Sequence, residues 1–315
     1  MPTRKSPRKG SLQFWPRKRA EKFLPSVNWN AIKSTGSKNP LNGFICYKAG
    51  MASAAVKDLT EHSMTKNKKI VVPVTILECP PIKILSARFY KNGIVATEVL
   101  AENLEKELKK KIKIPKKTKK LEEIKKEDFD DLRVIAYSVV KKTKIKKTPD
   151  ITEIGLSGNY EEKLKFVKEN WGKEISALNV FENGEILDVR GLTKGKGLQG
   201  PVKRFGITLK SHKSEKGVRR PGSLGPWHPA RVTFRVPMAG QIGLFTRVVY
   251  NHKIIDSGKG EGKFKNLKNY GNVHTDYILV KGSVQGPVKR QLLLTRAIRE
   301  TKKRKKKEFE LIELR

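Results

Sequence analysis

One glycine-rich motif in the chain has the spacing of a nucleotide-binding loop. Residues 195–200, Gly-Lys-Gly-Leu-Gln-Gly, match the GxGxxG pattern and follow a segment of strand-like sequence. A dinucleotide site also needs a helix that begins at the motif and an acidic residue about twenty positions further on. Pro201 follows at once, the sequence predicts no amphipathic helix there, and no acidic residue ends a second strand. We therefore expect these glycines to let backbone amides approach phosphates, while Lys194 and Lys196 add positive charge.

The residue types that most often carry catalysis are present, but not in catalytic spacing. Four of the five histidines lie in the C-terminal half, and none has a second ligand or a nucleophile at a recognisable distance in sequence. The chain contains no Walker loop, no GxSxG and no HExxH. Cys46 and Cys79 lack zinc-ligand spacing, so we expect two buried, reduced thiols. The sequence thus predicts no catalytic residue, no metal and no cofactor.

Residues 191–235 have the most unusual composition in the chain. They contain eleven Lys or Arg, a single acidic residue (Glu215), eight glycines and four prolines. A segment of this kind cannot bury much apolar surface, and its prolines interrupt regular elements. Trp227 lies between Pro226 and Pro229, which predicts a stiff cationic loop whose aromatic tip stacks on RNA. The alternative is a Trp227 ring that packs against the wall of the barrel formed by the strands described below.

The whole chain is strongly basic. Its 315 residues include 69 Lys or Arg and 31 Asp or Glu, which gives a net charge of +38. An excess of this size favours a nucleic-acid partner. A membrane partner would need an amphipathic or lipidated anchor or an apolar run of about 20 residues, and the sequence shows neither. It also lacks the apolar stretch of a signal peptide, so we expect a cytoplasmic protein without a membrane partner.

The hexapeptide QGPVKR occurs twice, at residues 199–204 and 285–290. We interpret both copies as turns at strand ends whose Lys-Arg pair faces phosphate. Residues 1–39 contain ten Lys or Arg among scattered aromatic residues, which favours an arm that orders on RNA over a disordered tail. The candidate RNA-binding residues are Arg17, Lys18, Arg19, Lys194, Lys196, Lys203, Arg204, Arg219, Arg220, Trp227, His228, Arg231, Lys289 and Arg290.

Strand signals dominate on both sides of a charged, helical section. Asn92-Gly93 predicts a hairpin between residues 82–90 and 94–99. Pro115 separates two expected helical pieces, and a further helix is expected at 160–171. Other strands are expected at 41–47 with a turn at 48–51, and at 70–79, 132–140, 175–181, 186–189, 231–236, 246–250, 277–280 and 292–296. So many short strands predict a closed or nearly closed antiparallel β-barrel, rather than a two-domain α/β protein in which strands and helices alternate.

These signals divide the chain into seven parts. The basic N-terminal arm is 1–39, and the basic C-terminal tail is 299–315. The α-containing insertion is 100–172, and the central basic extension is 191–235. The barrel comprises the remaining segments, 40–99, 173–190 and 236–298.

Several separated motifs resemble those of the universal large-subunit ribosomal protein three family. They are GFICYKAGM at 43–51, DV at 188–189, KGKGLQG at 194–200, KR at 203–204, GPWHPA at 225–230, NHKI at 251–254 and KGSVQG at 281–286. The match extends over nearly the whole chain. The basic arm and the insertion are similar to the archaeal and eukaryotic form, and abundant Lys, Glu and Ile favour the archaeal type.

The resemblance implies a mainly β protein with a six-stranded barrel of the translation-protein type, an α-containing insertion and long basic extensions. It implies that the chain binds 23S rRNA in the large ribosomal subunit, helps to start subunit assembly, and extends a loop with a finger at Trp227 toward the peptidyl transferase centre. It also implies neighbours among large-subunit proteins, notably fourteen and twenty-four-e, and no homo-oligomer. The alternatives are an RNA-modifying enzyme, which needs a cofactor pocket, and a free RNA-binding regulator.

Overall fold

The structure is a computed structural model that describes residues 9–11, 13–32, 39–102, 104–115, 118–119, 121 and 129–315. Strands make up 36% of the chain and helices 12%, which confirms the prediction of a mainly β protein. The chain forms two compact units. The smaller unit comprises Met1–Glu21 and Leu192–Arg247, and the larger unit comprises Lys22–Gly191 and Val248–Arg315.

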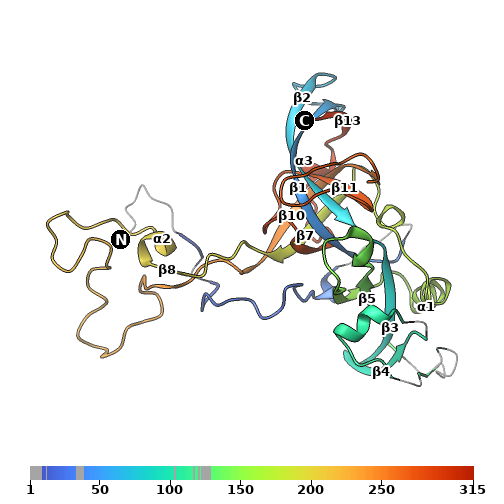
Figure 1. Cartoon of the computed structure of the whole chain (residues 1–315), viewed down its shortest axis with the longest axis horizontal. Helices are drawn as coiled ribbons and strands as arrows, with labels where there is room; N and C mark the ends of the chain where they lie inside the picture. Colours follow the sequence, from blue (N-terminus) through green and yellow to red (C-terminus); the bar gives the residue numbers. More distant parts are fainter. Residues whose placement is uncertain are drawn as a thin grey trace. The chain divides into compact units, whose positions relative to one another are not determined.

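A seven-stranded sheet organises the larger unit (Figure 1), in the order β12-β7-β10-β11-β2-β1-β13. Its strands are β1 (Gly43–Asp58), β2 (Lys69–Cys79), β7 (Ile186–Leu192), β10 (Thr246–Lys259), β11 (Asp276–Lys281), β12 (Gln291–Arg296) and β13 (Phe309–Leu314). β12 pairs antiparallel with β7 and also with β1, where Gly43 faces Thr295. Because of this second pairing, β1 has three partners along its length: β12, β2 and β13.

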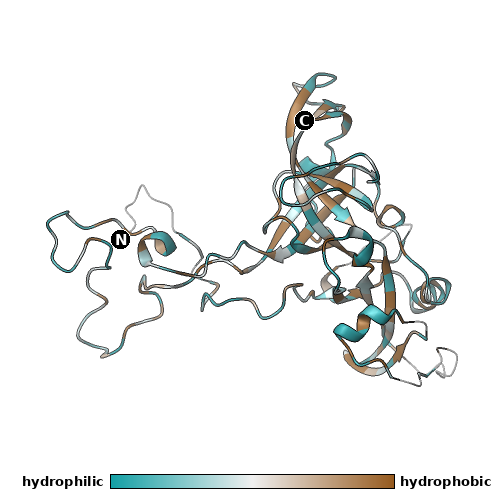
Figure 2. Cartoon of the chain, in the orientation of Figure 1, coloured by the Kyte–Doolittle hydropathy of each residue, from teal (hydrophilic) through white to brown (hydrophobic). Residues whose placement is uncertain are grey.

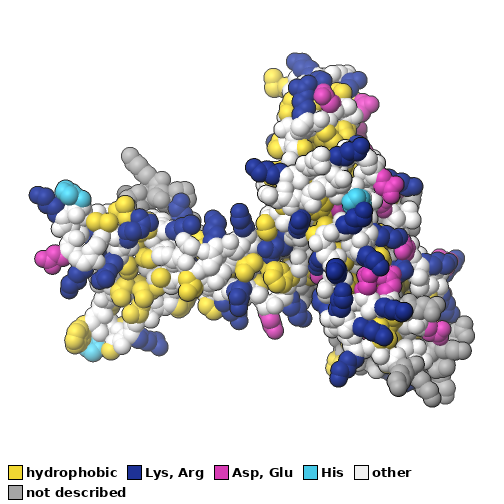
Figure 3. Space-filling model, viewed as in Figure 1, with side chains coloured by type: hydrophobic (Ala, Val, Ile, Leu, Met, Phe, Trp, Pro, Cys, Tyr) yellow, Lys and Arg dark blue, Asp and Glu magenta, His cyan; other side chains and the backbone are white. Residues whose placement is uncertain are grey.

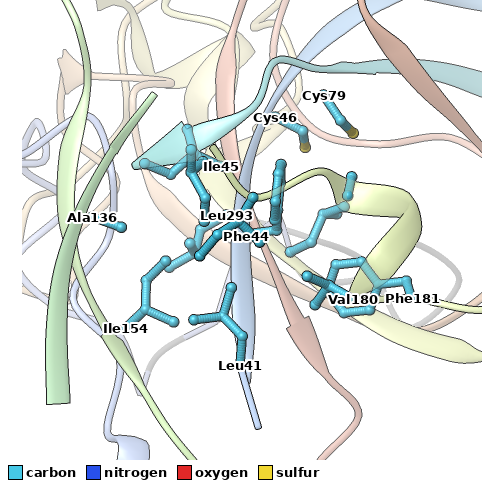
Figure 4. Packing of buried hydrophobic residues seen from close by; sticks show 14 of the residues in the cluster. Leu41, Phe44, Ile45, Cys46, Cys79, Ala136, Ile154, Val180, Phe181 and Leu293 are labelled. Carbon is cyan, nitrogen blue, oxygen red and sulfur yellow. The ribbon is translucent and has the colours of Figure 1, made fainter. Parts of the chain in front are cut away.

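The core of the larger unit lies against the N-terminal half of β1. Figure 2 shows hydrophobic residues concentrated in its strands, and Figure 4 shows Phe44 and Ile45 of β1 packing near Leu293 of β12. All three side chains are completely buried. Removing such apolar surface from water is the main favourable contribution to folding. Cys46 and Cys79 are both buried and free in this core, which confirms the prediction of two reduced thiols.

A four-stranded sheet, β4-β3-β5-β6, forms the second layer of structure in the larger unit. Its strands are β3 (Ile82–Lys91), β4 (Ile94–Leu100), β5 (Asp131–Ser138) and β6 (Ile151–Gly155). The hairpin predicted at Asn92-Gly93 is confirmed: both residues have positive φ, 51° and 75°, as a tight two-residue turn requires. Helix α1 (Tyr160–Glu169) begins with a capping box between Asn159 and Glu162.

Two sequence predictions about helices and turns near these sheets need correction. The expected helical piece before Pro115 contains only one short 3-10 helix, η2 (Lys106–Lys110), and most of the piece after Pro115 lies outside the described residues. The turn predicted at 48–51 is wrong, because β1 continues through it. The pairing of β1 with β2 shifts register between Lys48 and Gly50, so a β-bulge lies where the glycine suggested a turn.

Two predicted strands are absent, and β6, β13 and the two-residue strands of the smaller unit were not predicted. Residues 175–181 contain an isolated bridge and the 3-10 helix η5 (Ala177–Asn179), which begins where the Ser176 hydroxyl accepts a hydrogen bond from the Leu178 N–H. Residues 231–236 form bends and turns. In contrast, the expected C-terminal tail contains helix α3 (Lys302–Lys305) and β13, which pairs with the C-terminal half of β1.

The smaller unit has little regular structure. Its elements in the described residues are helix α2 (Pro201–Phe205) and the short pair β8 (Leu198–Gln199) and β9 (Gly240–Gln241). The segment between α2 and β9 is irregular. Most of its side chains are therefore placed by loops, and the position of those loops depends on a few anchoring contacts.

Candidate RNA-binding surface

Helix α2 directly follows the glycine motif of the smaller unit. It begins at Pro201, whose fixed φ suits the first helical position, and Gly206 ends it with a φ of 66°. The sequence analysis expected no amphipathic helix at this motif, and the helix found there has only five residues. Glu215 follows Gly195 by twenty positions but lies in a turn and does not end a strand, so the acidic position of a dinucleotide site is not formed. What α2 does is set Lys203 and Arg204 on different sides of the chain.

Arg204 is an internal anchor of the smaller unit. Its Nε donates to the carbonyl of Gln241 at 3.1 Å, and its Nη1 donates to the carbonyls of Met238 and Ala239 at 3.1 and 3.4 Å. Only 9% of the residue is exposed, and burial lowers its pKa. Arg204 therefore holds the segment that leads into β9, whereas the neighbouring Lys203 is exposed to solvent.

Trp15, Phe205 and Phe234 form an aromatic cluster in the smaller unit, in which Phe205 is buried and Phe234 is 61% exposed. Trp15 stacks on Phe205, with ring centroids 5.8 Å apart, and meets Phe234 edge-on at 5.7 Å. Arg17 lies over the Phe205 ring at 4.3 Å and donates to the Arg204 carbonyl at 3.1 Å. Aromatic stacking and cation–π contacts stabilise such a cluster where little aliphatic surface is available.

Most of the predicted RNA-binding residues are exposed. The exposed ones are Lys18, Arg19, Lys194, Lys196, Lys203, Arg219, Arg220, Trp227, His228, Arg231 and Lys289. Figure 3 shows that Lys and Arg far outnumber acidic side chains on the visible face of the smaller unit. Trp227 is 87% exposed, so its ring does not pack within the smaller unit. Arg17 and Arg290 are half-buried, and Arg204 is buried.

The second QGPVKR copy has a different structure from the first. Gly286 has a φ of 90°, whereas Gly200 has a φ of −69°, so the second copy is a turn and the first opens a helix. The Lys48 ammonium holds this turn by donating to the carbonyls of Val284 and Gly286 at 2.6 and 3.2 Å. The turn interpretation is therefore confirmed for residues 285–290 and wrong for 199–204.

Arg290 lies in a sheltered position beside this turn. Its guanidinium is over the Phe23 ring at 5.3 Å, and its Nη1 is buried without a hydrogen-bond partner among the described residues. Burial lowers the pKa of both Arg290 and Lys48. Neither cation has a carboxylate within ion-pair distance in the described part of the chain, so the turn carries positive charge that the larger unit does not neutralise.

Sequence analysis missed another group of cations in the larger unit. Lys253, Lys281 and Arg304 belong to β10, to β11 and to α3, and Lys307 follows α3. They come from distant parts of the sequence, so their proximity has no local signal. The only hint was that the motifs NHKI and KGSVQG include Lys253 and Lys281.

In the described residues, no group of three or more His, Cys, Asp or Glu side chains is arranged to hold a metal ion. None of the helices found there is long and apolar enough to span a membrane.

Comparison with known proteins places the chain in a family. The family model described as ribosomal protein L3 matches residues 1–314. The chain is 41% identical to large ribosomal subunit protein uL3 of Methanocaldococcus jannaschii over 309 residues, which cover 93% of this chain and 91% of the relative.

Two more proteins of the same name show similar agreement. The protein of Archaeoglobus fulgidus is 40% identical over 94% of this chain and 93% of its own length, and that of Methanococcus vannielii is 42% identical over 93% and 91%. These relatives are ribosomal proteins and not enzymes, which agrees with the prediction from the motifs. The chain therefore belongs to the ribosomal protein L3 family.

Proposed function

We propose that the chain is a structural constituent of the large ribosomal subunit that binds 23S rRNA directly. The observation that carries the proposal is the composition of residues 192–247, which hold twelve Lys or Arg and one acidic residue around a cluster of three aromatic rings. A segment with so large an excess of positive charge favours a polyanion as its partner. Because the relatives are large ribosomal subunit proteins, rRNA of that subunit is the polyanion that fits.

Binding in this proposal depends on charge and on shape. Each Lys or Arg that contacts a phosphate releases condensed counterions, which gives affinity and a steep dependence on salt, but little sequence preference. The exposed Trp227 adds stacking, worth about 1–3 kcal/mol per base on an aromatic ring. Arg204 and the aromatic cluster supply the shape, because they fix the segments on which the exposed cations lie.

The finer features of the proposal concern architecture and neighbours. We infer that β1, β2, β7, β10, β11 and β12 act as a six-stranded barrel of the translation-protein type, because β12 pairs with both β7 and β1. We infer that residues 191–235 reach the peptidyl transferase centre with Trp227 at their tip, and that the chain helps to start subunit assembly. Large-subunit proteins fourteen and twenty-four-e are the neighbours we expect.

The experiment that tests the proposal is crosslinking in cells, followed by sequencing of the RNA bound to the protein. We would compare the wild type with Trp227→Ala, and use Trp227→Phe, which keeps an aromatic ring, as the matched control. Reads should concentrate on 23S rRNA, and those near the peptidyl transferase centre should decrease in Trp227→Ala but not in Trp227→Phe. Reads scattered over messenger and transfer RNA would instead favour a free RNA-binding regulator.

A further inference from the structure

We propose that Lys281, Arg304 and Lys307, supported by the buried Lys253 and together with it called the α3 cluster, form a second phosphate-binding surface for RNA that is made entirely by the larger unit. The inference rests on the proposed function, because it assumes that the polyanion is rRNA. It goes beyond the proposed function by assigning RNA contacts to the sheet and to the C-terminal segment. None of these four residues was among the candidate RNA-binding residues of the sequence analysis.

Arg304 has the geometry of a preorganised phosphate ligand. Its Nη1 donates to the carbonyls of Tyr250 and Asn251 at 3.1 and 2.7 Å, which fixes the plane of the guanidinium. Asn251 has a φ of 61°, and its N–H is held by the Asp188 carboxylate at 2.9 Å, so the carbonyl that Arg304 uses is itself fixed. Arg304 is exposed, and a guanidinium has further N–H donors on its other atoms.

Two of the three lysines of the cluster are also held in place by the fold. The Lys281 ammonium lies over the Phe309 ring at 4.0 Å, where β13 begins. The Lys253 ammonium donates to the Lys305 carbonyl at 3.1 Å, which attaches β10 to the end of α3. A lysine fixed in this way loses less conformational freedom on binding a phosphate than a free surface lysine does.

Positive charge in the α3 cluster is only partly offset by the protein. Burial lowers the pKa of Lys281, and the cations Lys307 and Arg304 lower it further, against the opposing effect of Asp58. Burial also lowers the pKa of Lys253, against the opposing effects of Glu308 and Glu300. Mutual repulsion of this kind is relieved when an external anion binds.

Cations elsewhere in the larger unit behave differently. Arg133 pairs with Asp131 at 2.9 Å, and Lys163 pairs with the same carboxylate at 2.6 Å. Arg296 pairs with Glu185 at 2.9 Å. In the described residues, no carboxylate lies within ion-pair distance of the four α3-cluster side chains, although Lys305, in the same segment, pairs with Glu300 at 2.7 Å. Arg133, Lys163 and Arg296 are thus paired within the protein, whereas the α3-cluster side chains, like Lys48 and Arg290, have no carboxylate at that distance among the described residues.

RNA fits this surface better than an acidic protein does. Residues 302–307 are six consecutive Lys or Arg, and lysine is depleted at the centre of protein–protein interfaces. A dense group of fixed Lys and Arg is instead the footprint of a phosphate backbone. Binding of an acidic protein to the cluster, in place of RNA, would therefore overturn the proposal.

The test compares double variants of the full-length protein, each of which lacks two positive charges. Arg304→Gln with Lys307→Gln removes charge from the α3 cluster, Lys203→Gln with Arg219→Gln removes it from the smaller unit, and Lys69→Gln with Lys142→Gln is the matched control. The measurement is the dissociation constant for a 23S rRNA fragment over a range of salt concentrations. The α3-cluster variant should reduce the slope of log affinity against log salt by about 1.4 to 1.8, since each phosphate contact contributes about 0.7 to 0.9. The control should leave the slope unchanged.

The outcomes separate this inference from the proposed function. If the wild type does not bind the rRNA fragment, the proposed function fails. If it binds and only the smaller-unit variant changes the slope, the proposed function stands and the α3 cluster is not an RNA surface. If the α3-cluster variant binds rRNA as the wild type does but no longer binds a polyglutamate peptide that the wild type binds, the partner of the cluster is an acidic protein and the inference is wrong. If Arg304→Gln loosens α3 in thermal unfolding, Lys307→Gln alone repeats the test, with an expected loss of slope of about 0.7 to 0.9.

Discussion

The guanidinium of Arg17 lies 4.3 Å from the centre of the Phe205 ring, so two segments almost 190 positions apart in sequence share one core. Arg17 also donates to the carbonyl of Arg204, which itself anchors three carbonyls near β9. The N-terminal segment is thus part of the smaller unit and not an independent tail. Arg17 and Arg204, which the sequence analysis assigned to RNA binding, therefore stabilise the fold of the smaller unit.

Arg204 and Lys203 should therefore respond differently to the same substitution. Arg204→Ala removes the donor to the carbonyls of Gln241, Met238 and Ala239, and a hydrogen bond from a charged group contributes about 1.5–3 kcal/mol. We expect faster cleavage between α2 and β9 in limited proteolysis. Lys203→Ala should leave the cleavage rate unchanged and reduce only the salt dependence of rRNA binding.

Arg204→Lys is the informative control for this pair. It keeps the charge but cannot reach three carbonyls with a planar fork of donors. If Arg204→Lys resists proteolysis as the wild type does, the charge of Arg204 matters and its hydrogen-bond geometry does not. That result would contradict the structural role argued here.

Trp227 should be neutral for stability. Its side chain is 87% exposed, so Trp227→Ala removes almost no buried surface, and surface substitutions of this kind usually change the free energy of unfolding by less than about 0.5 kcal/mol. Trp15→Ala, which removes a ring stacked on Phe205, should loosen the smaller unit. Thermal unfolding of the two variants measures the difference. A large loss of stability in Trp227→Ala would mean that its ring packs in the free protein.

The sequence predicted elements whose signal is local. Asn92-Gly93 specifies its hairpin because both residues adopt positive φ, and residues 70–79 are apolar and β-branched enough to indicate β2. It failed where distant partners decide the structure. The same hexapeptide QGPVKR is a helix start at 199–204, where Arg204 finds three carbonyls, and a turn at 285–290, where Lys48 holds two.

The candidate site was predicted in the same uneven way. The sequence predicts that Trp227 and the cations between α2 and β9 are exposed, because the segment is rich in proline, glycine and charged residues. A segment of this composition cannot form a hydrophobic core. The strand β13 was missed because its alternation of apolar and acidic residues is short and comes after a run of six consecutive basic residues. With β13 unknown, nothing in the sequence places Phe309 under the ammonium of Lys281.

The Asn92-Gly93 turn provides a direct test of local specification. Gly93→Ala puts a side chain on a residue with a φ of 75°, where an L-residue is disfavoured by about 1–2 kcal/mol. Asn92→Gly is the control, since glycine adopts the φ of 51° at that position without strain. Urea unfolding should therefore show lower stability for Gly93→Ala than for Asn92→Gly. Equal midpoints would mean that the β3–β4 hairpin tolerates another turn type.

His252 should make the larger unit sensitive to acid. Its Nδ1 is 2.9 Å from the Lys281 carbonyl, while its Nε2 is buried without a hydrogen-bond partner among the described residues. Burial lowers the pKa of His252 below its usual 6.5, and Arg304 lowers it further, against the opposing effects of the Lys281 carbonyl and Asp188. The unfolded chain thus binds a proton at a higher pH than the folded chain does. Stability is therefore complete above about pH 6.5 and decreases as the pH falls toward the lowered pKa.

His252→Gln removes this proton linkage and isolates its contribution. Between about pH 7.5 and about pH 5, we expect the free energy of unfolding to fall more steeply for the wild type than for His252→Gln. The extra loss should be about 1.4 kcal/mol for each unit by which the pKa of His252 differs between the folded and the unfolded chain. His62→Gln, which removes an exposed histidine, is the control and should follow the wild-type curve. Urea unfolding at several pH values measures all three proteins. Parallel curves for the wild type and His252→Gln would show that the protonated His252 ring finds a hydrogen-bond acceptor in the folded protein. Burial of His252 would then not make the β10–β11 contact sensitive to acid.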